Sequence, residues 1–112
     1  MLRAAKDFAA LQHSTRSRSD RLLAARFAAN DQQGTRFGIS TGRRVGGAVV
    51  RNRVRRRIRE SLRALAPRFI GGWDVLIVAR PESATASRAE LAGTLERLLR
   101  KGGALREEGI EV

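Results

Sequence analysis

The chain of 112 residues contains no cysteine and no tyrosine. Without cysteine there is no disulfide framework and no thiolate metal site, which fits a reducing compartment. No apolar run approaches the roughly 20 residues that a membrane span requires. The N-terminal residues also lack the apolar core of a secretory signal. We therefore expect a cytoplasmic protein with no membrane partner.

Acidic residues are scarce as well, with 11 Asp and Glu against 23 Lys and Arg. Apart from Glu107, Glu108 and Glu111, no acids have the close spacing that holds a divalent ion. His13 is the only histidine, and no phosphate-binding glycine pattern occurs. Nucleophilic or metal-assisted hydrolysis needs such a constellation. We predict no catalytic residue and no metal ligand in the protein, so it is a binding module or its partner holds the catalytic centre.

Arginine, by contrast, is concentrated in one stretch. Residues 43–63 hold nine arginines and a single acid, Glu60, and so carry most of the formal net charge of +12. From Ala48 to Leu65 there is no Gly or Pro, and Pro67 prevents continuation, which predicts a helix over 48–65. At about 100° per residue, one face of this helix is apolar and the rest is basic. The apolar stripe consists of Val50, Val54, Ile58, Leu62 and Leu65, with Ser61 among them.

A basic helix of this kind has three possible interpretations. A merely solvated face usually mixes charges of both signs, because opposite charges at i,i+4 are mildly stabilising. A helix lying on an anionic membrane is disfavoured, since the stripe lacks Trp and Phe. Guanidinium groups present a flat fork of donors that matches phosphate oxygens, so a polyanion, most simply a nucleic acid, is favoured. Asn52 adds a donor and an acceptor for a sugar hydroxyl or a base edge.

The remaining patterns predict a single domain over 1–112, with its core in 2–101 and a frayed tail in 102–112. Alternating apolar residues indicate strands, and Asn30–Gly34 is typical of a hairpin loop joining two antiparallel strands. Ser87 and Glu90 form a capping box before a leucine-rich helix that ends at Gly102-Gly103. The fold class is α+β, one sheet covered by helices. The other expected elements are a helix at 2–12, strands at 21–29, 35–41 and 73–79, and an extra short strand near 15–19.

The run FGISTGRRVGGAVVRNRVRRRIRE, residues 37–60, resembles the signature of the bacterial ribonuclease P protein component. That pattern is a strand, a basic pair, a Gly-x-Ala-Val turn, an Arg-Asn-Arg triplet and a basic helix ending in Arg-Glu. Further matches extend the resemblance to residues 2–101. These are Asp7-Phe8, Asp74-Val75 and Ala79-Arg80-Pro81.

The resemblance implies the protein subunit of an endonuclease whose catalytic subunit is RNA. This complex removes the 5′ leader of precursor tRNA by hydrolysis, with Mg²⁺ held mainly by the RNA. The implied partners are the catalytic ribonuclease P RNA and precursor tRNA. The implied fold is the α/β sandwich of the ribosomal-protein S5 domain-2 type, of order α-β-β-(β)-α-β-α. Its βαβ crossover is left-handed, against the usual rule.

Carried over residue by residue, the resemblance implies two binding surfaces. A cleft for the single-stranded leader would involve Phe8, with Gln12 and Arg26 where relatives usually have further aromatics. We therefore expect the contacts with the leader to be more polar in this protein than in its relatives. Phe27 is expected on the opposite face of the sheet from Arg26. The RNA-facing set is Arg43, Arg44, Arg51, Asn52, Arg53, Arg55, Arg56 and Arg59.

Two other functions fit the same charge and size. A structural RNA-binding protein, such as a ribosomal component, is the main alternative. A DNA-binding helix module fits less well, because no second helix precedes the arginine helix across a short turn. We therefore expect no DNA partner.

Overall fold

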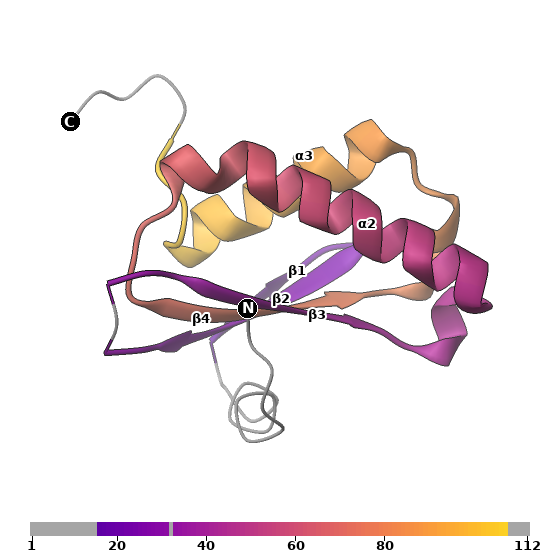
Figure 1. Ribbon diagram of the computed structural model, residues 1–112, viewed down its shortest axis with the longest axis horizontal. Coiled ribbons are helices and arrows are strands. Elements are labelled where there is room, and N and C mark those ends of the chain that lie inside the picture. The colour runs from indigo at the N-terminus through magenta and orange to yellow at the C-terminus, as the bar shows by residue number, and fades with distance from the viewer. Residues whose placement is uncertain (1–15, 32, 108–112) are drawn as a thin grey trace.

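The structure is a computed structural model that describes residues 16–31 and 33–107. Two helices lie on one face of a four-stranded sheet (Figure 1). The predicted helix 2–12, with Phe8 and Gln12, lies outside the described residues. The strands and helices are β1 (Ser17–Ser19), β2 (Leu23–Ala29), β3 (Arg36–Thr41), α2 (Ala48–Leu65), β4 (Trp73–Ala79) and α3 (Arg88–Gly102). Short 3₁₀ turns are η1 (Arg43–Val45), η2 (Ala66–Arg68) and η3 (Pro81–Thr85).

The strand order is β1-β2-β4-β3, with β2 antiparallel and β3 parallel to β4. This confirms the strands expected at 21–29, 35–41 and 73–79, as well as the short one near 15–19. The predicted hairpin pairing is wrong, however, because β4 lies between β2 and β3. As the most apolar segment, β4 has Val75, Leu76 and Ile77 buried, and a central place covers it on both edges.

The loop at 30–34 explains why no hairpin forms. Its backbone bonds to the loop before β4: the Asn30 N–H donates to the Gly72 carbonyl at 2.8 Å, and the Gly72 N–H donates to Gly34 at 3.3 Å. Gly71 passes so close to this loop that an added Cβ would lie 1.7 Å from the Gln33 carbonyl oxygen. The segment 30–34 is therefore a loop, as its composition predicted. It pairs with the loop before β4 at one end of the sheet and does not form a hairpin turn between paired strands.

The connection from β3 through α2 to β4 joins two parallel neighbours. It is left-handed, as the resemblance implied and against the common right-handed rule (Figure 1). The architecture is thus the α/β sandwich expected from the sequence. The crossover lays α2 across the sheet, so one helix face is committed to the core and the rest is available to solvent.

The core lies between the sheet and the two helices. Alternation along β2 buries Phe27 (1% exposed) on the helix side, which confirms that it faces away from Arg26. The Phe27 ring packs on Gly102 of α3, where an added Cβ would lie 2.1 Å from Cζ. Four leucines of α3 complete this layer: Leu91, Leu95, Leu98 and Leu99.

The expected fraying of 102–112 is wrong for the start of that segment. Helix α3 ends at Gly102, and Gly103 adopts the left-handed conformation (φ 90°) typical of a helix C-cap. Ala104 and Leu105 are buried, and Leu105 forms a β-bridge with Phe69. The chain therefore belongs to the core as far as Leu105, because both side chains pack in the main hydrophobic cluster. None of the described helices has the length and apolar character to cross a bilayer.

Candidate nucleic-acid interface

Helix α2 is anchored by its apolar stripe, as predicted. Val54 and Ile58 are fully buried and Leu62 is 7% exposed, with Ser61 buried beside them. Val50, at one end of the stripe, is half-buried and packs on the same core. The helix is therefore fixed to the sandwich along its length, and its arginines cannot turn inward together.

The basic faces of α2 remain without counter-charges. Arg56, Arg59 and Arg63 are exposed, while Arg51 and Arg55 are half-buried. Within residues 16–31 and 33–107, no arginine of α2 forms an ion pair with a carboxylate. The helix also has no acid in its first turn. Its like charges repel one another at i,i+4, and an external polyanion would relieve that repulsion.

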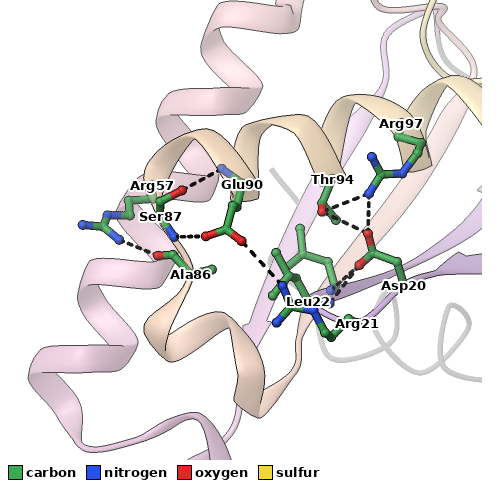
Figure 2. A network of polar contacts seen from close by, with 10 residues as sticks. Asp20, Arg21, Leu22, Arg57, Ala86, Ser87, Glu90, Thr94 and Arg97 are labelled. Atoms are coloured by element: carbon green, nitrogen blue, oxygen red, sulfur yellow. Dashed lines mark hydrogen bonds and ion pairs between the residues drawn. The ribbon is translucent and has the colours of Figure 1, made fainter.

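The carboxylates that do form ion pairs are used elsewhere. Asp20 Oδ2 forms an ion pair with a terminal nitrogen of Arg97 on α3 at 2.7 Å. Its Oδ1 accepts a hydrogen bond from the backbone N–H of Leu22 at 2.8 Å (Figure 2). Burial alone would raise the pKa of Asp20, but these hydrogen bonds outweigh burial and lower the pKa. The Ser87–Glu90 capping box begins α3 as predicted, and its hydrogen bonds lower the pKa of Glu90.

Two polar contacts hold Arg55 in one orientation. One terminal nitrogen donates to Thr41 Oγ1 at 2.6 Å, and the other donates to Asn52 Oδ1 at 3.0 Å. Thr41 is the last residue of β3, so the contact ties the sheet to the basic side of α2. Sequence reasoning missed Thr41, because nothing local links it to a residue 14 positions away.

Arg53 and Arg57 lie on the other flank of the stripe and bind the backbone around η3. Arg53 donates to the Ala84 carbonyl at 2.9 Å, and Arg57 donates to the Ala86 carbonyl at 3.1 Å (Figure 2 shows the latter). The Nε atoms of both are buried without a protein partner. Arg53 thus lies apart from the other members of the RNA-facing set.

The start of α2 gathers the remaining basic residues. Arg43 and Arg44 are exposed in η1, which is fixed by the buried Val45. Gly46 connects η1 to α2 with a φ of 152°, and an added Cβ would lie 3.0 Å from Val50. A side chain is therefore excluded at this turn. Asn52 is exposed one turn into the helix, so Arg43, Arg44 and Asn52 share this end of the molecule, whereas Arg59 lies about three turns into α2.

Arg26 belongs to a different surface. It is half-buried on β2, opposite Leu76 of β4, and its side of the sheet faces away from α2 and α3. Leu76 is nonetheless buried there, packed with Ala28 and Val78. The predicted site residues therefore divide between two faces, the basic helix on one side and Arg26 on the other. Phe8 and Gln12 lie outside the described residues.

The Arg26 face also carries a strong ion pair. Asp74 accepts from Arg36 through both oxygens, at 2.8 and 2.6 Å, and from Asn30 at 2.8 Å. Burial alone would raise the pKa of Asp74, but the hydrogen bonds from Arg36 and Asn30 and the charge of Arg36 lower it. Among the described residues, no three His, Cys, Asp or Glu side chains gather as a metal site would require.

Comparison with known proteins identifies a family whose sequences match this chain. The family model described as Ribonuclease P matches residues 1–103. The ribonuclease P protein component of Roseiflexus castenholzii is 36% identical over 103 residues, covering 91% of this chain and 84% of its own. That of Acidothermus cellulolyticus is 38% identical over 100 residues, covering 88% and 83%.

Solved structures share the fold at lower sequence identity. The RNase P protein of Staphylococcus aureus superposes with a TM-score of 0.86 at 23% identity, covering 94% of this chain and 96% of its own. That of Thermotoga maritima gives 0.82 at 24% identity, covering 89% and 94%. At these identities the likeness concerns the fold alone.

Proposed function

Because this chain belongs to the ribonuclease P protein family, the protein component of a ribonucleoprotein endoribonuclease that acts in tRNA 5′ processing, we propose that η1 and α2 form its RNA-binding surface. The partners are the catalytic RNA and precursor tRNA. The observation that carries the proposal is a helix full of arginines, anchored by its apolar stripe, with no carboxylate of the described residues paired to it. The exposed guanidinium groups of such a helix can bind successive phosphates of a nucleic-acid backbone.

The exposed arginines supply most of the contacts. Each guanidinium can bind two phosphate oxygens at once, and every neutralised phosphate releases counterions. Arg55 is oriented in advance by Thr41, so less side-chain entropy is lost when it meets a phosphate. The proposed RNA contacts are Arg43, Arg44, Arg51, Asn52, Arg55, Arg56 and Arg59.

Arg53 has a different role in this proposal. Its guanidinium already donates to the Ala84 carbonyl, beside the parallel contact of Arg57 with Ala86. We assign Arg53 to holding η3 against α2, and any contact with RNA would use only its remaining donors. The triplet 51–53 would then combine two RNA contacts with one structural anchor.

The opposite face of the sheet is proposed to take the 5′ leader. Arg26 lies there opposite the buried Leu76, with the partly buried Ala28 and Val78 packed beside it. Phe8 and Gln12 join it in the proposal on the strength of the family resemblance alone. A face that combines a cation with partly exposed apolar residues suits a single strand, whose bases stack while its phosphates need counter-charge. The catalytic RNA and the leader would therefore meet different faces of the protein.

Catalysis is assigned to the RNA subunit, in the cytoplasm where tRNA precursors mature. Mg²⁺, held mainly by that RNA, would supply the activated water for phosphodiester hydrolysis. The protein's residues orient the RNA and reduce the repulsion between phosphates of catalyst and substrate.

Reconstitution tests the proposal directly. The protein is mixed with a bacterial ribonuclease P RNA and a precursor tRNA, at low and at physiological Mg²⁺. We expect release of the 5′ leader, with the largest stimulation at low Mg²⁺, because fixed arginines replace part of the ionic screening. The protein alone should cleave nothing. Cleavage that persists after all catalytic RNA is removed would contradict the assignment.

The main alternative, a structural component of the ribosome, predicts a different RNA partner. RNA that copurifies with the protein distinguishes the two. One discrete RNA that cleaves precursor tRNA supports ribonuclease P, whereas ribosomal RNA supports the alternative.

A further inference from the structure

An apolar pocket lies beside the C-terminal half of α2, away from the Arg-Asn-Arg triplet. Its volume is about 380 Å³, within the range of small-molecule sites. The aromatic rings of Phe37 and Phe69 meet in its wall, with centroids 4.8 Å apart and planes tilted by 44°. The lining residues are Phe37, Arg59, Leu62, Arg63, Ala66 and Phe69.

Two cations stand at the rim of this apolar pocket. Arg59 and Arg63 are one turn apart on α2, and both are exposed. In the described part of the chain, neither forms an ion pair with a carboxylate. The last turns of α2 therefore offer positive charge beside an aromatic and aliphatic surface. Few ligands match both properties at once.

We propose that this pocket binds an unpaired nucleobase of the RNA, with a flanking phosphate on Arg59 or Arg63. The flat face of a base contacts Phe69 and Leu62, as bases stack on aromatic side chains in single-strand binders. The guanidinium groups meet the phosphate through paired hydrogen bonds. This inference rests on the proposed RNA-binding function and adds to it a nucleotide site at the far end of the helix.

Charge favours a nucleotide over the other possible occupants. An apolar peptide, or the same face of a second copy, would cover Arg59 and Arg63 without supplying an anion. Taking a charge out of water without a partner is costly. A nucleotide fills the apolar volume and neutralises the rim together.

Nuclear magnetic resonance of the ¹⁵N-labelled protein tests the site with adenosine 5′-monophosphate as the probe. Ribose 5-phosphate, which has the phosphate and sugar but no base, is the matched control ligand. We expect saturable shifts of the backbone amides in 62–70 with the nucleotide. Loss of base stacking should weaken binding of ribose 5-phosphate at these amides by roughly fivefold or more.

Variants separate the two parts of the site. Phe69→Leu and Arg63→Gln should each weaken nucleotide binding at amides 62–70 by roughly fivefold. Arg88→Gln, an exposed arginine at the start of α3, should leave it unchanged. Thermal unfolding checks that each variant folds. If Phe69→Leu fails to fold, the Arg63→Gln variant and the comparison of the two ligands still test the proposed site.

Three results would overturn the proposal. The first is equal binding of the two ligands at 62–70, and the second is shifts confined to the N-terminal half of α2. The third is nucleotide binding that a chain ending at Glu107 gains and the full chain lacks, since residues 108–112 would then be the occupant. Cleavage by the reconstituted complex is measured separately. Its persistence in any of these cases would show that only the pocket assignment had failed.

Discussion

The guanidinium of Arg55 donates a 2.6 Å hydrogen bond to Oγ1 of Thr41, and so joins α2 to the last residue of β3. Thr41→Val keeps the shape of the side chain but removes the acceptor. We expect a loss of about 1 kcal/mol in the free energy of unfolding, and weaker RNA binding because Arg55 is no longer held. Urea unfolding and RNA titration at fixed salt measure the two effects. Thr41→Ser retains the hydroxyl and serves as the control; an equal loss in both variants would contradict this role.

Truncation of the adjacent residues Arg56 and Arg57 to alanine should affect different properties, RNA binding in the first case and stability in the second. Arg56 is exposed, so Arg56→Ala should weaken RNA binding by about 1–3 kcal/mol and lower the salt slope by about one. The free energy of unfolding of the Arg56→Ala variant should differ from that of the parent by less than about 0.5 kcal/mol. Arg57→Ala removes the bond to the Ala86 carbonyl and should cost about 1 kcal/mol of stability.

Filter binding over a range of salt, with thermal unfolding beside it, tests this contrast. If Arg56→Ala unfolds the domain while RNA affinity per folded molecule is kept, the placement of the charged face is wrong.

Two glycines of α3 should differ in sign when replaced by alanine. Gly102→Ala would place Cβ 2.1 Å from the Phe27 ring, which is buried and cannot move aside, so we expect a loss of more than about 2 kcal/mol. Gly93→Ala meets nothing within 4 Å and should stabilise the helix by about 0.4–1 kcal/mol. Calorimetric unfolding of both variants measures the difference. Similar midpoints for the two would show that Phe27 does not pack on Gly102.

Acid should weaken the fold partly through Asp74. Its pKa is lower in the folded protein than in the unfolded chain, so its ion pair stabilises the fold above about pH 4. That contribution is lost as the pH falls through the folded pKa. Asp74→Asn should therefore be less stable than the parent at pH 7 and should lose less stability on acidification.

Urea unfolding at several pH values between about 2 and 7 provides the measurement, with linkage giving the expected slopes. Asp31→Asn removes an exposed carboxylate from a neighbouring loop and controls for net charge. A parent and an Asp74→Asn variant with parallel acid slopes would rule out this contribution.

The arginine helix could be predicted from sequence because its signals are local. The absence of Gly and Pro, the 3.6-residue stripe and Pro67 together set the bounds Ala48–Leu65, and the structure has the same bounds. The stripe also identified which side would be buried. Charged residues that avoid the core then had to lie on the other faces.

Strand pairing was not predictable in the same way. The loop at 30–34 has the composition of a hairpin turn, yet its backbone bonds to Gly72, which is distant in sequence. Contacts of Arg53 and Arg57 with the carbonyls of Ala84 and Ala86 are equally non-local. Local chemistry therefore identified the elements and the basic surface. It did not identify which arginines the fold itself uses.

The middle position of β4 has a consequence for synthesis on the ribosome. Until residue 79 has emerged, β2 and β3 have no shared neighbour, and the apolar stripe of α2 lacks most of its sheet. We expect a nascent chain that stops after α2 to bind nucleic acid without selectivity, because its charge is present before the sheet that positions it. Because β2 and β3 pair only through β4, and α3 packs on α2 and β2 only after it, we expect selective RNA binding to begin once both β4 and α3 have been made.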